Sequence, residues 1–209
     1  MNIVIFGASG GTGRCLVEQA LAAGHYVTVL QHHSKIRKTD SQLRILQGDV
    51  LTYFDVENAI RGQDAVLCAL GTKNVKGTTV LSQGTQNICA AMKRFGLNRF
   101  ICESSLGVGD SLAQTSFFFR YLLMPFFLRH VFADKAIQEQ IIQDSGLRRW
   151  VIVRPAALTN GKATGQYRLD DTEDTSFKGG TISRADVAAF MLQQLKEDTY
   201  AQKVVSIAY

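Results

Sequence analysis

The chain has 209 residues, of which 46% are hydrophobic and 20% charged, a composition that suits one globular domain with a full core. No apolar run reaches the roughly 18 residues of a membrane-spanning helix, and the chain starts with a strand pattern rather than a basic leader. We therefore expect a cytoplasmic protein without stable membrane insertion. The net charge of +5 suits acidic small molecules or nucleic acid, but the basic residues are dispersed, so nucleic-acid binding is not favoured.

The four cysteines lie inside helix or strand patterns and form no CxxC motif or Cys/His pair. This arrangement is typical of reduced thiols in a core and predicts no metal site. The residues concerned are Cys15, Cys68, Cys89 and Cys102.

The stretch from Ile3 to Arg14 combines an apolar run, three glycines at GxxGxxG spacing and the start of an amphipathic segment, which predicts strand, tight turn and helix. Gly7 permits a sharp turn, Gly10 permits close approach of the backbone to a pyrophosphate, and Gly13 permits close packing of helix on strand. The free N–H groups at the helix start would hold the phosphate charge. The predicted dinucleotide site contains Gly7, Ser9, Gly10, Gly11, Thr12, Gly13 and Arg14.

The end of the second predicted strand, 25–30, decides which dinucleotide is preferred. An acid there would pair with the ribose hydroxyls of NAD, whereas basic residues accommodate the 2′-phosphate of NADP. The chain continues with no acid before Asp40, so the sequence favours NADPH. The candidates for the phosphate are His32, Ser34, Lys35 and Arg37, with Arg14 also in reach.

Strand and helix patterns alternate along the rest of the chain. Further strands are expected at 43–50, 65–70, 99–103, 150–153, near 167 and at 203–208. Helices are expected at 14–23, 52–62, 78–95, 134–144 and 187–195. Thr52 and Ser183 each begin a stretch with capping-box spacing. This order predicts a single Rossmann-like α/β domain over 1–209, a doubly wound parallel sheet with helices on both faces.

In this architecture ligands bind beyond the carboxyl ends of the strands, which meet at one edge of the sheet. The residues that the sequence places there include Gly7, Gln31, Asp49, Gly71 and Ser105. We therefore expect them to share one cleft.

The alternation stops at about 106–130, a segment with five of the twelve phenylalanines. Because this segment directly follows Ser105, we expect it to form a lid or a flat apolar wall over the cleft, with Phe117 against the substrate. Two rival interpretations stay open. In the first the segment is a membrane-surface helix with Arg120, Arg129 and His130 at its edge, and in the second it is a dimer face.

Several stretches resemble the atypical, or extended-type, short-chain dehydrogenase/reductase family. The matching motifs are Gly7 to Gly13, Gly48-Asp49-Val50, 145–147 leading to 151–155, and 182–187. Within this family the chain is most similar to the branch of biliverdin reductase B and the NADPH-dependent flavin reductases. The stretches that carry this second likeness are 62–66, 70–74, 78–80, 87–93 and 164–167.

The resemblance implies a monomeric enzyme that binds NADPH and passes a hydride to a planar acceptor, such as FMN, FAD or a biliverdin-type linear tetrapyrrole. By position, Ser105 with Ser104 would lie beside the nicotinamide and the acceptor, and Lys73 could meet acidic ligand groups. The remaining cofactor contacts implied are Asp49, Val50, Leu70, Gly71, Thr72 and Pro155.

The chain departs from the family pattern at two positions. Ala157, on the acceptor side, replaces a histidine of mammalian members, and Val131 replaces the tyrosine of the Tyr-xxx-Lys pair, although Lys135 fits the lysine. A carbonyl substrate needs a positioned acid worth about 10²- to 10⁴-fold in rate, whereas a flavin spreads the charge over its ring, so a ring acceptor is favoured. Two other functions stay possible, a non-catalytic NADPH-binding sensor or assembly factor and a docking module.

Overall fold

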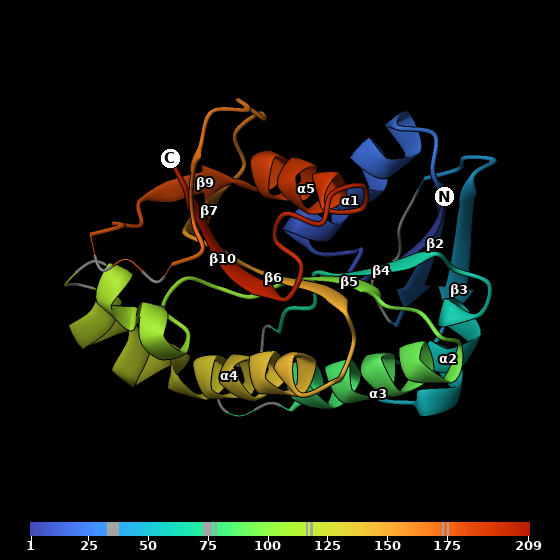
Figure 1. The fold of residues 1–209 in the computed structure, drawn as a ribbon, viewed down its shortest axis with the longest axis horizontal. Helices are drawn as coiled ribbons and strands as arrows, with labels where there is room; N and C mark the ends of the chain where they lie inside the picture. The colour runs from blue at the N-terminus through green and yellow to red at the C-terminus, as the bar shows by residue number, and fades with distance from the viewer. Residues whose placement is uncertain are drawn as a thin grey trace.

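The centre of the molecule is an eight-stranded sheet with the strand order β3-β2-β1-β4-β5-β6-β10-β8 (Figure 1). A computed structural model describes residues 1–32, 38–72, 77, 79–115, 117, 119–172, 174 and 176–209. The strands are β1 Asn2–Phe6, β2 Tyr26–Gln31, β3 Leu43–Gln47, β4 Ala65–Cys68, β5 Arg99–Glu103, β6 Arg149–Pro155, β8 Arg168–Asp170 and β10 Lys203–Ala208. Neighbouring strands are parallel except for β10 and β8, which are antiparallel.

Helices cover both faces of this sheet, which confirms the predicted Rossmann-like fold class. The helices α1 Gly11–Ala22 and α5 Arg184–Gln193 contact each other on one face. The other face carries α2 Tyr53–Ile60, α3 Val80–Arg94 and α4 Arg129–Gln143 (Figure 1). No helix within the described residues has the length and apolar content that crossing a membrane requires.

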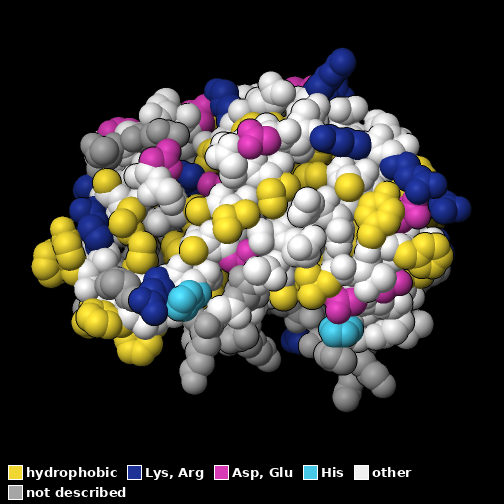
Figure 2. All heavy atoms as spheres, turned by 90° about the horizontal axis from the view of Figure 1, so that it is seen from below, with side chains coloured by type: hydrophobic (Ala, Val, Ile, Leu, Met, Phe, Trp, Pro, Cys, Tyr) yellow, Lys and Arg dark blue, Asp and Glu magenta, His cyan; other side chains and the backbone are white. Residues whose placement is uncertain are grey.

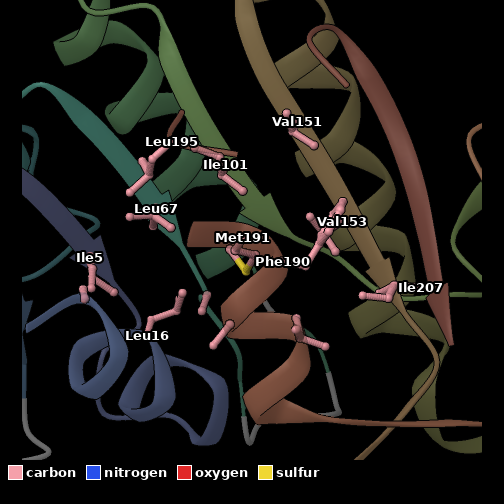
Figure 3. Close-up of a cluster of buried hydrophobic side chains, with 14 of the residues drawn as sticks. Ile5, Leu16, Leu67, Ile101, Val151, Val153, Phe190, Met191, Leu195 and Ile207 are labelled. Carbon is pink, nitrogen blue, oxygen red and sulfur yellow. The ribbon is translucent and has the colours of Figure 1, made fainter. Parts of the chain in front are cut away.

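Two hydrophobic cores result, one on each face of the sheet. Ile5 and Leu67 of the central strands pack with Leu16 of α1 and Phe190 of α5 in the first core (Figure 3). The second core lies between the sheet and α2 to α4 and contains Phe6, among others. Because both faces of the sheet are covered, the sequences of the central strands are continuous apolar runs. This pattern made these strands predictable.

Element boundaries differ from the sequence predictions where a tertiary contact intervenes. The third strand ends at Gln47 rather than at residue 50, since a turn follows in which the Thr52 N–H donates to the Asp49 carbonyl at 3.0 Å. The capping box predicted at Thr52 is absent, because the Asp55 carboxylate instead accepts a hydrogen bond from the Asp49 N–H at 2.9 Å. In contrast, the Ser183 hydroxyl does cap α5 and accepts from the Asp186 N–H at 2.9 Å.

Four short elements were not predicted, and α4 begins five residues earlier than expected. β7 Ala157–Thr159 and β9 Thr181–Ser183 form a parallel two-stranded sheet. η1 Gly109–Gln114 is a 3₁₀-helix, and η2 Phe119–Leu128 is a π-helix that runs into α4. Strands of three residues are too short for a hydrophobic period, so sequence patterns do not reveal them.

The Asp186 carboxylate ties the C-terminus to α5. Burial alone would raise its pKa, but hydrogen bonds from Tyr209, Thr164, Gly165 and Ser183 lower it to about 2. Because the folded-state pKa is depressed, this stabilisation is present above about pH 4 and is lost as the pH falls toward the folded-state value.

Replacing Tyr209 with phenylalanine should therefore lower the free energy of unfolding at neutral pH by about 1.5 kcal/mol, since it removes one hydrogen bond to a charged group. The loss should shrink as the pH falls to about 2, where Asp186 becomes protonated in part of the folded wild-type protein. Urea unfolding of both proteins at neutral pH and at about pH 2 measures it. An equal loss at both pH values would mean that the hydroxyl acts independently of the Asp186 charge.

Candidate functional site

The carboxyl ends of the parallel strands open into a cleft of about 1240 Å³. Residues from distant parts of the chain meet there because parallel strands end at the same edge of the sheet. Most of the predicted site residues line this cleft. They are Gly7, Ser9, Gly10, Gly11, Thr12, Arg14, His32, Asp49, Val50, Leu70, Gly71, Thr72, Ser104, Ser105, Pro155 and Ala157.

Two predicted residues lie elsewhere. Gly13 is buried between helix and strand, so its role is in packing, and Phe117 is 78% exposed and does not line the cleft. Four others fall outside the described residues. They are Ser34, Lys35, Arg37 and Lys73.

The glycine loop has the geometry that a bound phosphate requires. Gly7 has φ +79, where a side chain would meet the backbone of Ala69 and Leu70. Gly10 precedes α1 without a side-chain cap, and its N–H donates to the Gly7 carbonyl at 3.0 Å. The first turn of α1 therefore faces the cleft with uncapped N–H groups and the positive end of the helix dipole.

Arg184, at the start of α5, is a candidate that sequence reasoning missed as a ligand contact. A Cβ built on Gly11 would lie 2.5 Å from both Cδ and Nε of Arg184, so the guanidinium crosses the first residue of α1. Its Nη1 donates to Asn160 Oδ1 at 2.7 Å and to the Leu158 carbonyl at 3.4 Å. This cation lines the cleft beside the glycine loop, where an anion would be held. The one signal in the sequence is its place in the capping box.

The opposite end of the cleft contains a His32–Asp49 pair, with 3.6 Å between His32 Nε2 and Asp49 Oδ2. The neighbouring Val50 is held by α3, because Asn87 Nδ2 donates to the Val50 carbonyl at 2.9 Å. α3 approaches this closely at Gly84, where a Cβ would lie 2.9 Å from Val50 Cγ2. These contacts position the loop 48–50 at the cleft wall.

The end of β5 brings three polar side chains to the cleft. The Ser104 hydroxyl is buried and has no hydrogen-bond partner among the described residues, while Ser105 Oγ donates to the Leu106 carbonyl at 3.3 Å. Glu103, which the sequence analysis did not select, is also buried, and its Oε1 accepts from Thr12 Oγ1 at 2.8 Å. Burial raises the pKa of this carboxyl. Lys135 of α4 lines the cleft and donates to the Glu103 carbonyl at 3.4 Å.

A buried ion-pair network supports the far side of the cleft. The Arg154 guanidinium is 2.7 Å from a Glu139 oxygen of α4 and 2.6 Å from Asp110 of η1. Because Arg154 precedes Pro155, these contacts join β6 to the elements that follow β5. Removing one partner of such a buried pair leaves an uncompensated charge, so the loss of Glu139 would destabilise this wall.

The aromatic segment lies at one end of the molecule. Phe126 and Phe127 of η2 are 73% and 61% exposed, and no described residue from 117 to 128 lines the cleft. Figure 2 shows hydrophobic side chains gathered at this end, beside Lys, Arg and His side chains. Leu106 and Thr115, in the first half of the segment 106–130, do line the cleft. The lid, membrane-surface and dimer-face interpretations of this segment all stay predictions.

Comparisons with known proteins show the family and the fold of this chain. A family model described as NAD(P)H-binding matches residues 7–198. A chloroplastic protein of Arabidopsis thaliana is 31% identical over 218 residues, which cover 99% of this chain and 76% of that protein. ChuY, an anaerobilin reductase from Escherichia coli O157:H7, has a TM-score of 0.82 and 26% identity, with 100% of this chain and 97% of that chain covered.

A wide-type short-chain dehydrogenase/reductase from Veillonella parvula, solved in complex with NADP, has a TM-score of 0.84. Its identity is 16%, with 100% of this chain and 94% of that chain covered, so this likeness concerns the fold alone. The chain belongs to the NAD(P)H-binding family. Its resemblance to the atypical short-chain dehydrogenases/reductases is thereby confirmed, and it has the fold of NAD(P)H-dependent oxidoreductases.

Proposed function

We propose that this protein is an NADPH-dependent reductase that transfers a hydride to a planar acceptor, either a flavin such as FMN or FAD or a biliverdin-type linear tetrapyrrole. The observation that carries the proposal is the uncapped start of α1 behind the glycine loop, opening into a cleft of about 1240 Å³. A typical pocket for one small ligand has about 300–1,000 Å³, so the cleft has room for a dinucleotide and a second ring system.

The residues present fit NADPH. Gly10, Gly11 and Thr12 would receive the diphosphate, Asp49 and Val50 the adenosine, and Lys35 and Arg37 the 2′-phosphate. When bound, NADPH supplies the hydride. The buried Ser104 hydroxyl has no hydrogen-bond partner among the described residues, and Ser104 lines the cleft, so this hydroxyl would fit a polar ligand group.

The chain itself would act by orienting the two rings. Ser104 and Ser105 would hold the nicotinamide or acceptor by hydrogen bonds, so that the two rings lie at near-attack separation, about 3–3.5 Å. Val131 and Ala157 occupy the positions where family members have a tyrosine and a histidine. A substrate that needs no positioned acid is therefore favoured. The likeness to an anaerobilin reductase supports a bilin as one acceptor class.

The direct test is to follow the oxidation of NADPH by the purified protein with FMN, FAD and biliverdin, with NADH as the cofactor control. We expect turnover with at least one planar acceptor and a preference for NADPH. Tight NADPH binding without turnover would instead favour a non-catalytic sensor or assembly factor, the second candidate, which the replaced histidine and tyrosine also fit. A cytoplasmic location and a monomeric state stay predictions from the sequence.

Replacing Arg184 with glutamine should weaken NADPH and NADH binding by a similar factor of about tenfold, because the diphosphate that Arg184 faces is common to both and one charge-assisted hydrogen bond is worth about 1.5–3 kcal/mol. Titration of each nucleotide measures the effect.

The matched comparison is replacement of Lys35 and Arg37 with alanine. That change should weaken NADPH binding far more than NADH binding, since only NADPH carries the 2′-phosphate. A nucleotide-selective loss in the Arg184 variant would contradict its placement at the diphosphate. Equal losses in the double variant would show that these two residues do not bind the 2′-phosphate.

A further inference from the structure

Glu103 is a buried acid at the floor of the cleft that the proposed hydride transfer does not use. It is the last residue of β5 and is 8% exposed, and it lines the cleft beside Ser104 and Ser105. Its carboxyl accepts one hydrogen bond from a described residue, that from Thr12 Oγ1 at 2.8 Å. Thr12 lies in the first turn of α1, so this contact places the carboxyl directly behind the helix start that would bind a diphosphate.

Two cations and nearby thiols are the titratable groups around Glu103. Lys135 of α4 and Arg184 of α5 both favour the charged carboxylate, but neither forms an ion pair with it. Lys135 donates to the Glu103 backbone carbonyl, and Arg184 donates to Asn160 and Leu158. Cys15 of α1 and Cys68 of β4 are further titratable neighbours, and burial together with nearby carboxylates raises the pKa of the Cys15 thiol.

Burial outweighs these two cations and the Thr12 hydrogen bond, so the pKa of Glu103 is raised above its ordinary value. Any anion bound at the start of α1 would add a further negative charge close to this group. Like charges at close range disfavour the ionised form of a carboxyl.

We propose that Glu103 takes up a proton when the dinucleotide binds, so that nucleotide affinity falls as the pH rises. The inference rests on the proposed nucleotide site and adds a regulatory property to it. The protonated carboxyl removes the repulsion from the diphosphate, and its O–H becomes a hydrogen-bond donor in a part of the cleft that excludes water. The proton comes from the solvent and returns to it when the nucleotide leaves.

The test is calorimetric titration of the protein with NADH, in two buffers that differ in their heat of protonation. NADH is chosen because it lacks the 2′-phosphate, which itself titrates near pH 6. The wild-type protein should take up a proton on binding, and its affinity should fall by up to tenfold per pH unit through the window between the free and bound pKa values of Glu103.

Replacing Glu103 with glutamine keeps the shape and removes the charge. This variant should lose the proton uptake that Glu103 causes. It should also bind NADH more tightly than the wild type at high pH. The control is Glu18→Gln, which removes a carboxylate at an exposed position of α1, the helix that carries Thr12. This variant should behave like the wild type.

Equal pH dependence in the Glu103 variant and the wild type would overturn the inference. So would binding to the wild type with no net proton uptake, a result that does not depend on whether the variant folds. Failure of the wild type to bind NADH or NADPH at any pH would instead overturn the proposed function, and the inference with it.

Discussion

Replacing Gly13 with alanine should destabilise the fold by about 3 kcal/mol or more, because overpacking of a close backbone contact has no flexible side chain to absorb it. A Cβ at this position would overlap the Gly7 carbonyl oxygen and would lie 2.7 Å from the Ala8 Cα. Both obstacles are backbone atoms of the glycine loop. The helix α1 would have to move away from β1, and it would then lose its contact with the first hydrophobic core.

Urea or thermal unfolding measures this loss. Gly71→Ala is the matched control, because a Cβ there would have no heavy atom within 4 Å and the residue lines the same cleft. It should change the free energy of unfolding by less than about 0.5 kcal/mol. If Gly13→Ala were as stable as this control, α1 would not be seated on the glycine loop as described.

Replacing Gly10 with valine should weaken dinucleotide binding by about 100-fold or more while leaving the protein folded. A Cβ at Gly10 would lie 3.2 Å from the Gly7 carbonyl oxygen, and the residue has φ −71, which any L-amino acid adopts. On the protein side a Cβ therefore requires the Gly7 carbonyl to shift by a few tenths of an ångström. The branched γ-carbons would occupy the place where the diphosphate approaches the start of α1, at a loss of about two charge-assisted hydrogen bonds, or about 100-fold in affinity.

Titration with NADPH measures the affinity, and unfolding measurements on the same samples confirm the fold. Gly10→Ala provides a graded control, with a smaller loss of affinity than the valine variant. Unchanged NADPH affinity in Gly10→Val would contradict the placement of the diphosphate and, with it, the proposed cofactor site.

These two glycines illustrate how much of the site follows from local sequence. Each has a mechanical role that depends only on its place between an apolar run and an amphipathic segment, so spacing alone was sufficient to predict the turn, the helix and the cleft edge. The same is true of the central strands, whose apolar runs reflect burial on both faces. Ser104 and Ser105 were located in the same way, as polar residues at the end of such a run.

Other features of the site depend on contacts between distant residues. Glu103 reads as the last residue of a strand, and only its hydrogen bond to Thr12, 91 residues away, shows that it lies behind the start of α1. Arg184 reads as part of a helix cap, and its contact with Gly11 requires α5 to lie beside α1. Neither contact leaves a periodic signal in the sequence.

For the aromatic segment, the sequence predicted the kind of surface but not its position relative to the cleft. Its composition predicted an apolar surface, and the exposed side chains of Phe126 and Phe127 agree with that. Its position relative to the cleft depends on how η2 continues into α4, and no hydrophobic period encodes the direction of that connection.

Local pattern was thus sufficient for the fold class, the glycine loop and the strand-end residues, because backbone sterics and burial act over a few neighbouring positions. The tertiary structure decided which charges face the start of α1, and it removed Phe117 from the cleft lining. Those outcomes depend on the packing of whole elements across the sheet, where the distance between two side chains bears no relation to their separation in the chain.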